Sequence, residues 1–257
     1  MLIVLPPSES KRPNPDRGAP VGIDRLSFPE LNALRGQVID SLIATSGEPD
    51  ALDRLRVGPT LGSEVVRNID LLTEPARPAI EVYSGPLYDG LGVDSMDAKT
   101  RKRADSHVVI ASALWGLLRP TDRIPAYRLH ICSNLVGVDR IDAMWRTELP
   151  NVLAEAAGDR GVIVDLRSPM YQASGRAAGM ARRTVTVRVG PAASHGGVGD
   201  VVAKRIRGQA ARYLLESGAD PDDPEVLALV LGEHWPVNLD EPLRPGQPWS
   251  LQIRPLD

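Results

Sequence analysis

An arginine-rich segment from Ser112 to Leu129 (SALWGLLRPTDRIPAYRL) carries residue types suited to binding an anion. It follows an apolar, β-branched run, His107 to Ala113, which predicts a buried strand. Each proline fixes its own φ angle and favours extended geometry in the residue before it, so Arg119-Pro120 and Ile124-Pro125 predict a stiff turn. Guanidinium groups fixed on such a turn are pre-organised to bind phosphate or carboxylate groups.

Other polar residues follow the predicted ends of strands. Ser8, Glu9 and Lys11 come directly after the first apolar run and its two prolines. Loops in this position commonly present ligand-binding side chains in mixed sheets, although a solvated Glu9–Lys11 pair is the alternative. Asp165 ends a later predicted strand, where it could either orient an arginine or act as an acid or base.

Four basic residues are the candidate phosphate ligands: Arg119, Arg128, Lys204 and Arg207. Structural salt bridges with nearby carboxylates are the alternative for all four. Tyr88 is a candidate for the lining of a cleft, because Gly85 close by would let a ligand approach the backbone. Tyr83, Trp115 and Trp145 are better suited to the core, since each tryptophan lies in apolar surroundings.

Residues 50–72 predict two helices joined by a tight Gly-Pro turn. The centre of this unit, Leu55 to Gly62 (LRVGPTLG), resembles the V-G-P-x-x-A hairpin of helix-hairpin-helix DNA-binding units. Such a hairpin offers backbone N–H groups to a phosphate without reading sequence, which makes Arg56, Gly58 and Gly62 candidate contacts. A plain connection between two helices is the alternative interpretation.

The remaining pattern predicts further helices and strands in mixed order. Helices are expected over 28–42, 142–157 and 199–217, and strands over 1–5, 108–111, 161–166, 183–189 and 249–253, with a further apolar segment over 226–231. Neither an internal repeat nor a long linker divides the chain. We therefore expect one α+β domain over residues 1–257, with a mixed sheet, surrounding helices and the hairpin unit at 50–72 within it.

Composition narrows the functional class. A chain of 257 residues with 42% apolar content predicts a soluble globular protein, and its opening predicts a first strand rather than a signal peptide. The lone Cys132 fits a reducing compartment, and no apolar run is long enough to span a bilayer, so we expect a cytoplasmic protein without membrane contact. The net charge of −3 argues against a uniformly basic nucleic-acid binder, yet the clustered arginines allow one basic face.

No cofactor or metal site is predicted. The four histidines lie far apart in the sequence and lack the spacing of metal ligands. The glycine-rich run Gly196 to Gly199 precedes a predicted helix, where it could bind an anion or serve as a hinge.

Several blocks, in order and rough spacing, resemble the YaaA peroxide-stress protein family. They are PPSESK at 6–11 (the family's PPSE-x-K), YSGPLYDGL at 83–91 (G-x-x-Y-x-G-L), the segment 112–129 itself, Met144-Trp145 (FW), VDLRS at 164–168 with Tyr171 (N-L-A-S-x-E-Y), and KRIRG at 204–208 (K-x-A-R-G). Asp165 replaces the family's asparagine, Met170 replaces its acidic residue, and the segment HICSNL lacks the usual glycine. These departures indicate a divergent branch.

The resemblance implies a YaaA-like fold, DNA binding, and protection of DNA during peroxide stress, including damage linked to iron. Our leading hypothesis is therefore a protein that contacts the phosphates of duplex, bent or branched DNA with little sequence preference and with steep salt dependence. The predicted contacts are Ser8, Lys11, Arg56, Gly58, Gly62, Tyr88, Arg119, Arg128, Ser168, Lys204 and Arg207. The alternative is an enzyme acting on a small nucleotide-like or otherwise anionic substrate, with Glu9 or Asp165 as acid or base. The oligomeric state stays open.

Overall fold

A mixed sheet of seven strands forms the centre of the protein, in the order β4-β3-β1-β6-β7-β9-β8. The computed structural model describes residues 1–190 and 199–256, so His195 and the predicted anion site or hinge at Gly196 to Val198 lie outside the described residues. The strands are β1 (Leu2–Leu5), β3 (Val108–Ser112), β4 (Gly116–Leu118), β6 (Ile163–Asp165), β7 (Thr184–Val189), β8 (Val237–Asp240) and β9 (Trp249–Ile253). A separate two-stranded sheet pairs β2 (Arg77–Pro78) with β5 (Arg123–Ile124).

Five of the seven strands are parallel, and the two edge strands β4 and β8 are antiparallel to their neighbours. The chain passes from β1 to β3 on one side and later to β6 on the other side of β1. Consequently the loops that leave β1 and β6 emerge side by side at the carboxyl ends of the parallel strands. In open sheets this is the edge at which ligands bind.

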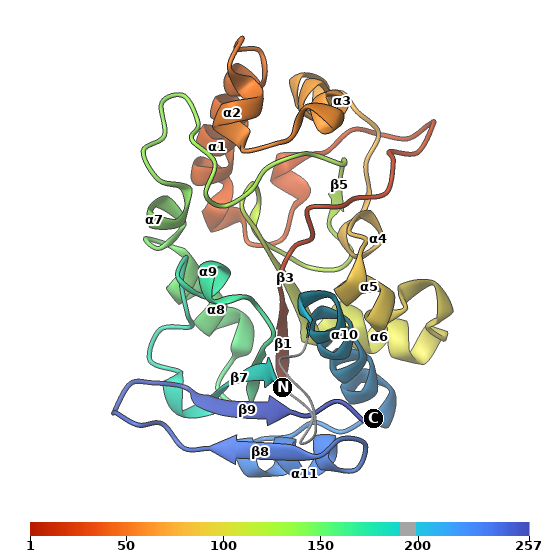
Figure 1. Cartoon of the computed structure of the whole chain (residues 1–257), viewed down its shortest axis with the longest axis vertical. Helices are drawn as coiled ribbons and strands as arrows, with labels where there is room; N and C mark the ends of the chain where they lie inside the picture. The colour runs from red at the N-terminus through yellow and green to blue at the C-terminus, as the bar shows by residue number, and fades with distance from the viewer. Residues whose placement is uncertain (191–198, 257) are drawn as a thin grey trace.

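Eleven α-helices of the described residues surround the sheet. They are α1 (Asn32–Ser46), α2 (Ala51–Leu55), α3 (Gly62–Val66), α4 (Ala79–Val82), α5 (Pro86–Leu91), α6 (Ala98–His107), α7 (Ile141–Trp145), α8 (Leu149–Ala157), α9 (Pro169–Gln172), α10 (Asp200–Ser217) and α11 (Pro224–Gly232). Short 3₁₀ turns occupy Ile23–Arg25, Pro29–Leu31, Pro59–Leu61, Arg67–Asp70, Val93–Ser95 and Ala181–Arg183. Helices α1 to α3 gather at one end of the molecule, and α11 lies with β8 and β9 at the other (Figure 1).

The expected α+β class with a mixed sheet and surrounding helices is confirmed. One expected helix, over 142–157, is instead two, α7 and α8. Pro150 stands in the first turn of α8 and has no N–H to donate, so a helix continuous with α7 would lack that hydrogen bond. Strands β4 and β8 were not predicted from the sequence.

Two glycines let α5 and α10 pack backbone to backbone. A Cβ atom on Gly90 would overlap the carbonyl oxygen of Arg205, and one on Gly208 would overlap the carbonyl oxygen of Leu87. Glycine is therefore required at both crossing points, because a side chain would force the helices apart. This contact holds α10 beside the loop that leaves β1.

Aromatic side chains complete the core as the sequence predicts. Trp115 and Trp145 are fully buried, and the indole N–H of Trp145 donates to the carbonyl oxygen of Ala113. No helix of the described residues combines the length and apolar character needed to cross a membrane.

Candidate functional site

A pocket of about 480 Å³ lies at the carboxyl ends of β1 and β6. Its walls come from the loop after β1, the loop after β6, the segment that follows β5, and the first two turns of α10. Five predicted site residues line it together with Tyr171 and His130: Ser8, Glu9, Ser168, Lys204 and Arg207. The structure thus gathers residues that are separated by up to 199 positions in the sequence (from Ser8 to Arg207).

Tyr88 and Gly85 hold the loop after β1 in place. The Tyr88 hydroxyl donates to the carbonyl oxygen of Pro6 over 2.9 Å, and Tyr88 is only 5% exposed. Gly85, with φ at +97°, brings its backbone close to Ser8, because an added Cβ would lie 3.2 Å from the Ser8 hydroxyl oxygen. Tyr88 therefore supports the loop and, like Tyr83, belongs to the core. Burial raises the pKa of Tyr88 well above its usual value, so its hydroxyl stays protonated.

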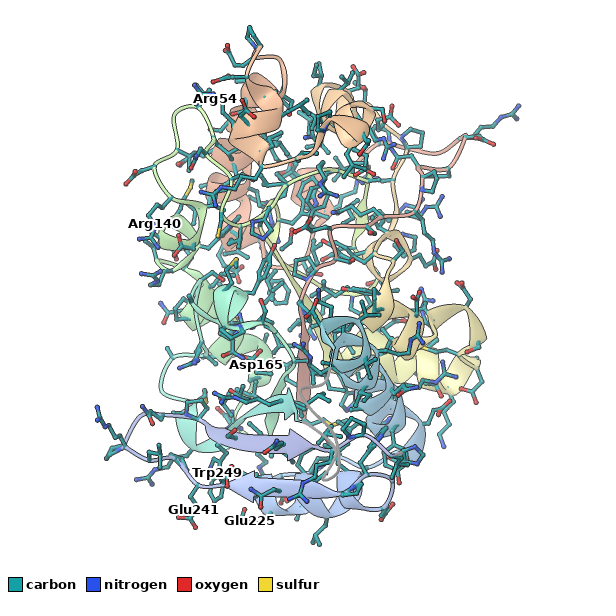
Figure 2. All side chains as sticks on the ribbon, viewed as in Figure 1. Arg54, Arg140, Asp165, Glu225, Glu241 and Trp249 are labelled. Carbon is teal, nitrogen blue, oxygen red and sulfur yellow. The ribbon has the colours of Figure 1, made fainter. Side chains whose placement is uncertain are left out.

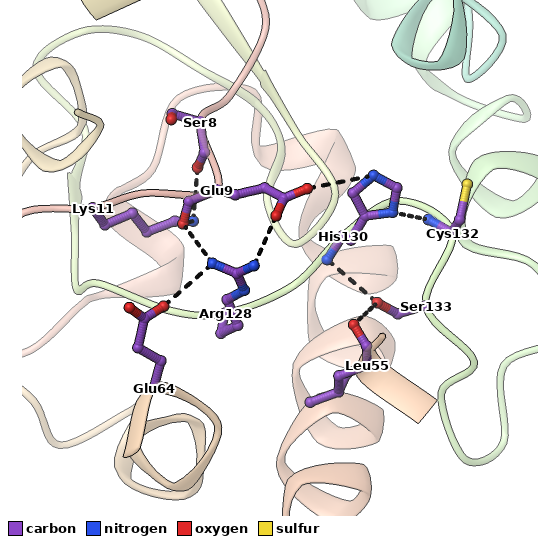
Figure 3. Close-up of polar contacts among 9 residues, drawn as sticks. All are labelled: Ser8, Glu9, Lys11, Leu55, Glu64, Arg128, His130, Cys132 and Ser133. Atoms are coloured by element: carbon purple, nitrogen blue, oxygen red, sulfur yellow. Dashed lines mark hydrogen bonds and ion pairs between the residues drawn. The ribbon is translucent and has the colours of Figure 1, made fainter. Parts of the chain in front are cut away.

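Glu9 is the centre of an exposed charge cluster at the pocket (Figure 3). Its carboxylate lies 2.7 Å from Nη2 of Arg128 and 3.6 Å from Nε2 of His130. Arg128 also reaches Glu64 of α3 at 3.4 Å, which connects the pocket to the hairpin unit. The Glu9 side chain is 53% exposed and that of Arg128 only 12%, so the guanidinium is held in place and the carboxylate can move aside.

His130 is a site residue that sequence reasoning missed, because the histidines were considered only as metal ligands. Its Nδ1 accepts a hydrogen bond from the backbone N–H of Cys132 over 3.1 Å. The neutral ring therefore carries its proton on Nε2, the atom that faces Glu9. The 3.6 Å between Nε2 and the Glu9 carboxylate is longer than a hydrogen bond, so the two side chains are polar neighbours at the pocket wall.

Lys11 lies beside the pocket loop, and backbone carbonyl groups hold its amine. Nζ donates to the carbonyl oxygens of Ser8 at 2.9 Å and Glu9 at 3.2 Å, and it lies 4.1 Å from the ring centre of Tyr127. Burial, followed by the charge of Arg128, lowers the pKa of Lys11 to about 7. A large share of this amine is therefore uncharged at neutral pH.

Asp165 takes the first of its two expected roles. It forms a two-pronged ion pair with Arg167, with Nε–Oδ1 at 2.9 Å and Nη2–Oδ2 at 2.8 Å, and both side chains are 2% exposed. Figure 2 labels Asp165 in the region of the seven-stranded sheet. Because its oxygens are occupied and sealed from solvent, Asp165 orients an arginine and does not line the pocket. Arg167 in turn donates to the carbonyl oxygen of Tyr171, which steadies the pocket wall.

Helix α10 supplies the cationic wall. Lys204 is exposed and pairs with Asp200 one turn earlier at 2.5 Å. Arg207 is half-buried, and among the residues that the structure describes its donors reach the carbonyl oxygens of Ala203 and Leu166. Within residues 1–190 and 199–256, no carboxylate lies within ion-pair distance of Arg207, and burial lowers the pKa of this guanidinium. Arg207 is therefore the cation best placed to receive an anion from the pocket.

Arg119 lies at the opposite edge of the sheet. It follows β4, which runs antiparallel to β3, and its Nη1 points toward the carbonyl oxygens of Ser106 and Val108 at the amino end of β3. The expected turn does form, and it is fixed by Asp122, whose carboxylate accepts the backbone N–H of Arg119. Antiparallel pairing of β4, which the sequence did not predict, carries this arginine away from the pocket.

The segment 50–72 forms α2, a 3₁₀ turn over Pro59–Leu61, α3 and a second 3₁₀ turn. Gly58 and Thr60 are exposed at the tip, and in the described residues their backbone N–H groups donate to no protein acceptor. Arg56 adopts a left-handed conformation with φ at 55° and borders a second pocket, which shares Met170 with the first. Gly62 opens α3 beneath this tip.

Groups of three or more histidine, cysteine, aspartate or glutamate side chains able to hold a metal ion do not occur in the part of the chain that the structure describes. The polar lining of the pocket consists instead of three serines, a tyrosine, the Glu9–His130 pair, and the cations Lys204 and Arg207 together with the carboxylate of Asp200. Such a wall is suited to an anionic ligand that also carries hydroxyl groups.

Fold and pocket together define an α+β protein with a polar cleft at the carboxyl edge of a mixed sheet. The sequence model described as "Peroxide stress protein YaaA" matches residues 1–235. A UPF0246 protein of Streptomyces coelicolor is 40% identical over 260 residues, which cover 98% of both chains. UPF0246 proteins of Corynebacterium efficiens (37% identical, 94% of this chain and 96% of the relative) and Francisella tularensis subsp. novicida (26%, 84% and 87%) are also similar. The chain belongs to the YaaA peroxide stress protein family.

Proposed function

We propose that this peroxide stress protein binds DNA through phosphate contacts made by the pocket wall and the hairpin unit. The carrying observation is Arg128, which contacts Glu9 at the pocket and Glu64 in α3. The link is reinforced at the backbone, where Asn68 both accepts from the N–H and donates to the carbonyl oxygen of Arg128. These contacts hold the hairpin unit against the loop that lines the pocket at Glu9.

The hairpin would supply the first set of contacts. Its exposed N–H groups at Gly58 and Thr60 are free to donate to a phosphate oxygen, and Arg56 stands beside them. Arg207 and Lys204 would supply the second set from α10. None of these groups reads a base edge, so the binding would depend on backbone shape and on salt rather than on sequence. In the cell it would protect DNA during peroxide stress, including damage linked to iron.

Fluorescence anisotropy with duplex, single-stranded and four-way-junction DNA tests the proposal. We expect Arg207→Ala and Arg56→Gly each to weaken binding at low salt. Arg244→Ala removes an exposed arginine from the connection between β8 and β9, and we expect it to bind as the parent does. Absence of binding to all three DNA forms at low salt would overturn the proposal.

A second candidate is an enzyme acting on a small anionic substrate in the same pocket. Its specific support is the Glu9–His130 pair, since a binding surface alone does not need two groups able to act as acid or base. Retained ligand affinity with abolished turnover in Glu9→Gln would identify this enzyme. If Glu9→Gln binds the ligand more weakly and the parent protein shows no detectable turnover, the enzyme hypothesis is excluded.

A further inference from the structure

Lys11 differs from the other three lysines of the chain in how its amine is held. Lys99, Lys102 and Lys204 are exposed, whereas Lys11 is partly buried and pairs with Tyr83 through an isolated β-bridge. Its Nζ is fixed by two backbone carbonyl oxygens and covers the face of Tyr127. The amine therefore has one defined position rather than the freedom of a surface lysine.

The charges around this amine are already engaged with one another. Arg128 occupies the carboxylates of Glu9 and Glu64, and neither lies within ion-pair distance of Nζ. Arg67 adds a further positive charge on the same side. Burial, followed by the charge of Arg128, disfavours the ammonium form, and these effects outweigh the opposing charges of Glu64 and Glu9 and lower the pKa of Lys11 to about 7. The phenol groups that face it, Tyr83 and Tyr127, stay protonated because burial raises the pKa of each.

An uncharged lysine amine held beside a second cation is a nucleophile toward carbonyl carbon. Its nitrogen lone pair forms a C–N bond to an aldehyde carbon, and the carbonyl oxygen takes up a proton. That proton comes from the amine, and the second amine hydrogen follows it to the oxygen as the C–O bond breaks, so one water molecule leaves and a C=N double bond remains. The step is balanced without an oxidant or a reductant.

The pocket indicates which aldehyde would fit. The two residues whose carbonyl oxygens hold the amine, Ser8 and Glu9, also line the pocket that contains Ser168 and Arg207. A molecule with its phosphate near Arg207 would thus contact Ser8 and Glu9, whose carbonyl oxygens hold the amine of Lys11, although Lys11 itself is not among the residues that line the pocket. Glu9, which is half exposed and paired with His130, can exchange the protons that the addition and the loss of water require.

We propose that Lys11 is a nucleophile that forms an imine with a phosphorylated aldehyde bound at this pocket. The inference rests on the proposed anion-binding function of the same pocket. Two sources offer this chemistry: the ring-opened deoxyribose at an abasic site in DNA, which is an aldehyde between two phosphates, and a free sugar phosphate.

Reductive trapping tests the proposal. The full chain is incubated with sodium cyanoborohydride and either an abasic-site duplex or glyceraldehyde 3-phosphate, and adducts are located by intact mass and peptide mapping. We expect a single adduct at Lys11, at least tenfold less adduct in Lys11→Arg, and the parental amount in Lys102→Arg, which alters an exposed lysine of α6. The trapping rate should rise with an inflection near pH 7.

The two probes distinguish the sources and separate this inference from the DNA-binding proposal. An adduct with the duplex alone supports the abasic-site source, and an adduct with glyceraldehyde 3-phosphate alone supports the free sugar phosphate, even if DNA binding fails. No adduct with either probe, or adducts spread over the exposed lysines, would overturn the inference. Binding to intact DNA is measured separately by anisotropy, so this result would leave the DNA-binding proposal unaffected. Peptide mapping of the parent protein gives this answer even if Lys11→Arg does not fold.

Discussion

Two acid–arginine pairs lie just beyond the ends of neighbouring strands, and they are built in opposite ways. Asp165, at the end of β6, and Arg167 are each 2% exposed, with two short N–O contacts between them. Glu9, after β1, is 53% exposed and shares Arg128 with Glu64. A sealed pair has no route to a ligand, whereas an exposed carboxylate can leave its arginine when a stronger anion arrives. We therefore assign scaffolding to the first pair and ligand exchange to the second.

The largest expected effect is on the sealed pair. Arg167→Met leaves the Asp165 carboxylate buried without its partner, and we expect a loss of about 3–5 kcal/mol in the free energy of unfolding. Arg128→Met is the matched change in the open pair, where the stranded carboxylates can reach water, and we expect a loss of about 1 kcal/mol or less. Urea denaturation measures both. Equal losses in the two variants would abolish the distinction between the pairs.

The next prediction tests whether the pocket depends on the close packing of α10 against α5. Gly208→Ala adds a methyl group where it overlaps the Leu87 carbonyl oxygen, so we expect a loss of about 1–3 kcal/mol and weaker anion binding. Gly36→Ala is the control, because no atom lies within 4 Å of the added Cβ in α1. We expect it to gain about 0.5–1 kcal/mol. An unchanged free energy of unfolding in Gly208→Ala would show that α5 and α10 can move apart without cost.

A smaller effect is expected at Arg56 in the hairpin unit, where one substitution relieves backbone strain and removes a positive charge. Arg56 has φ at 55°, a conformation that glycine adopts without cost, so Arg56→Gly should raise the free energy of unfolding by up to about 1 kcal/mol. The same change removes a proposed phosphate contact and should weaken DNA binding. Thermal unfolding and anisotropy on one protein sample give both results. Lower stability together with unchanged binding would contradict both expectations.

The last prediction is a pH dependence that arises from Lys11, whose amine is held by the carbonyl oxygens of Ser8 and Glu9. Because the pKa of Lys11 falls from 10.5 in the unfolded chain to about 7 in the folded protein, the unfolded state binds more protons between these values. This group's contribution to stability therefore rises as pH increases from 7 to 10.5. Lys11→Met should show a flatter stability profile over that range than the parent protein. If the stability profiles of Lys11→Met and the parent protein superimpose, the pKa of Lys11 is not lowered in the folded protein.

Local sequence signals were enough to predict most of the fold and part of the pocket. The β-branched runs at β3 and β7, and the long pattern of α10, specify those elements without distant contacts. Polar residues directly after β1 and β6 could be predicted because parallel strands bring their carboxyl ends to one edge. That rule placed Ser8 and Glu9 on a ligand-facing loop, whereas Ser168 was predicted only through the resemblance of its sequence block to the family.

The remainder depended on pairings that a sequence does not display. Arg119 lies away from the pocket because β4 runs antiparallel to β3. A strand of only three residues is too short to be predicted from its sequence pattern. His130 joins the pocket only because its ring accepts the Cys132 N–H and faces Glu9, an interaction across 121 residues. Whether Asp165 was sealed or open likewise depended on burial by distant segments.

The salt dependence of DNA binding tests the central claim most directly. Removing a single phosphate-binding cation should reduce the slope of log Kobs against log salt by about 0.9 for duplex DNA. We predict this reduction in Arg207→Ala, at the open pocket, and the parental slope in Arg244→Ala. Identical slopes in the parent and both variants would contradict the assignment of the pocket at the ends of β1 and β6 as a phosphate-binding site.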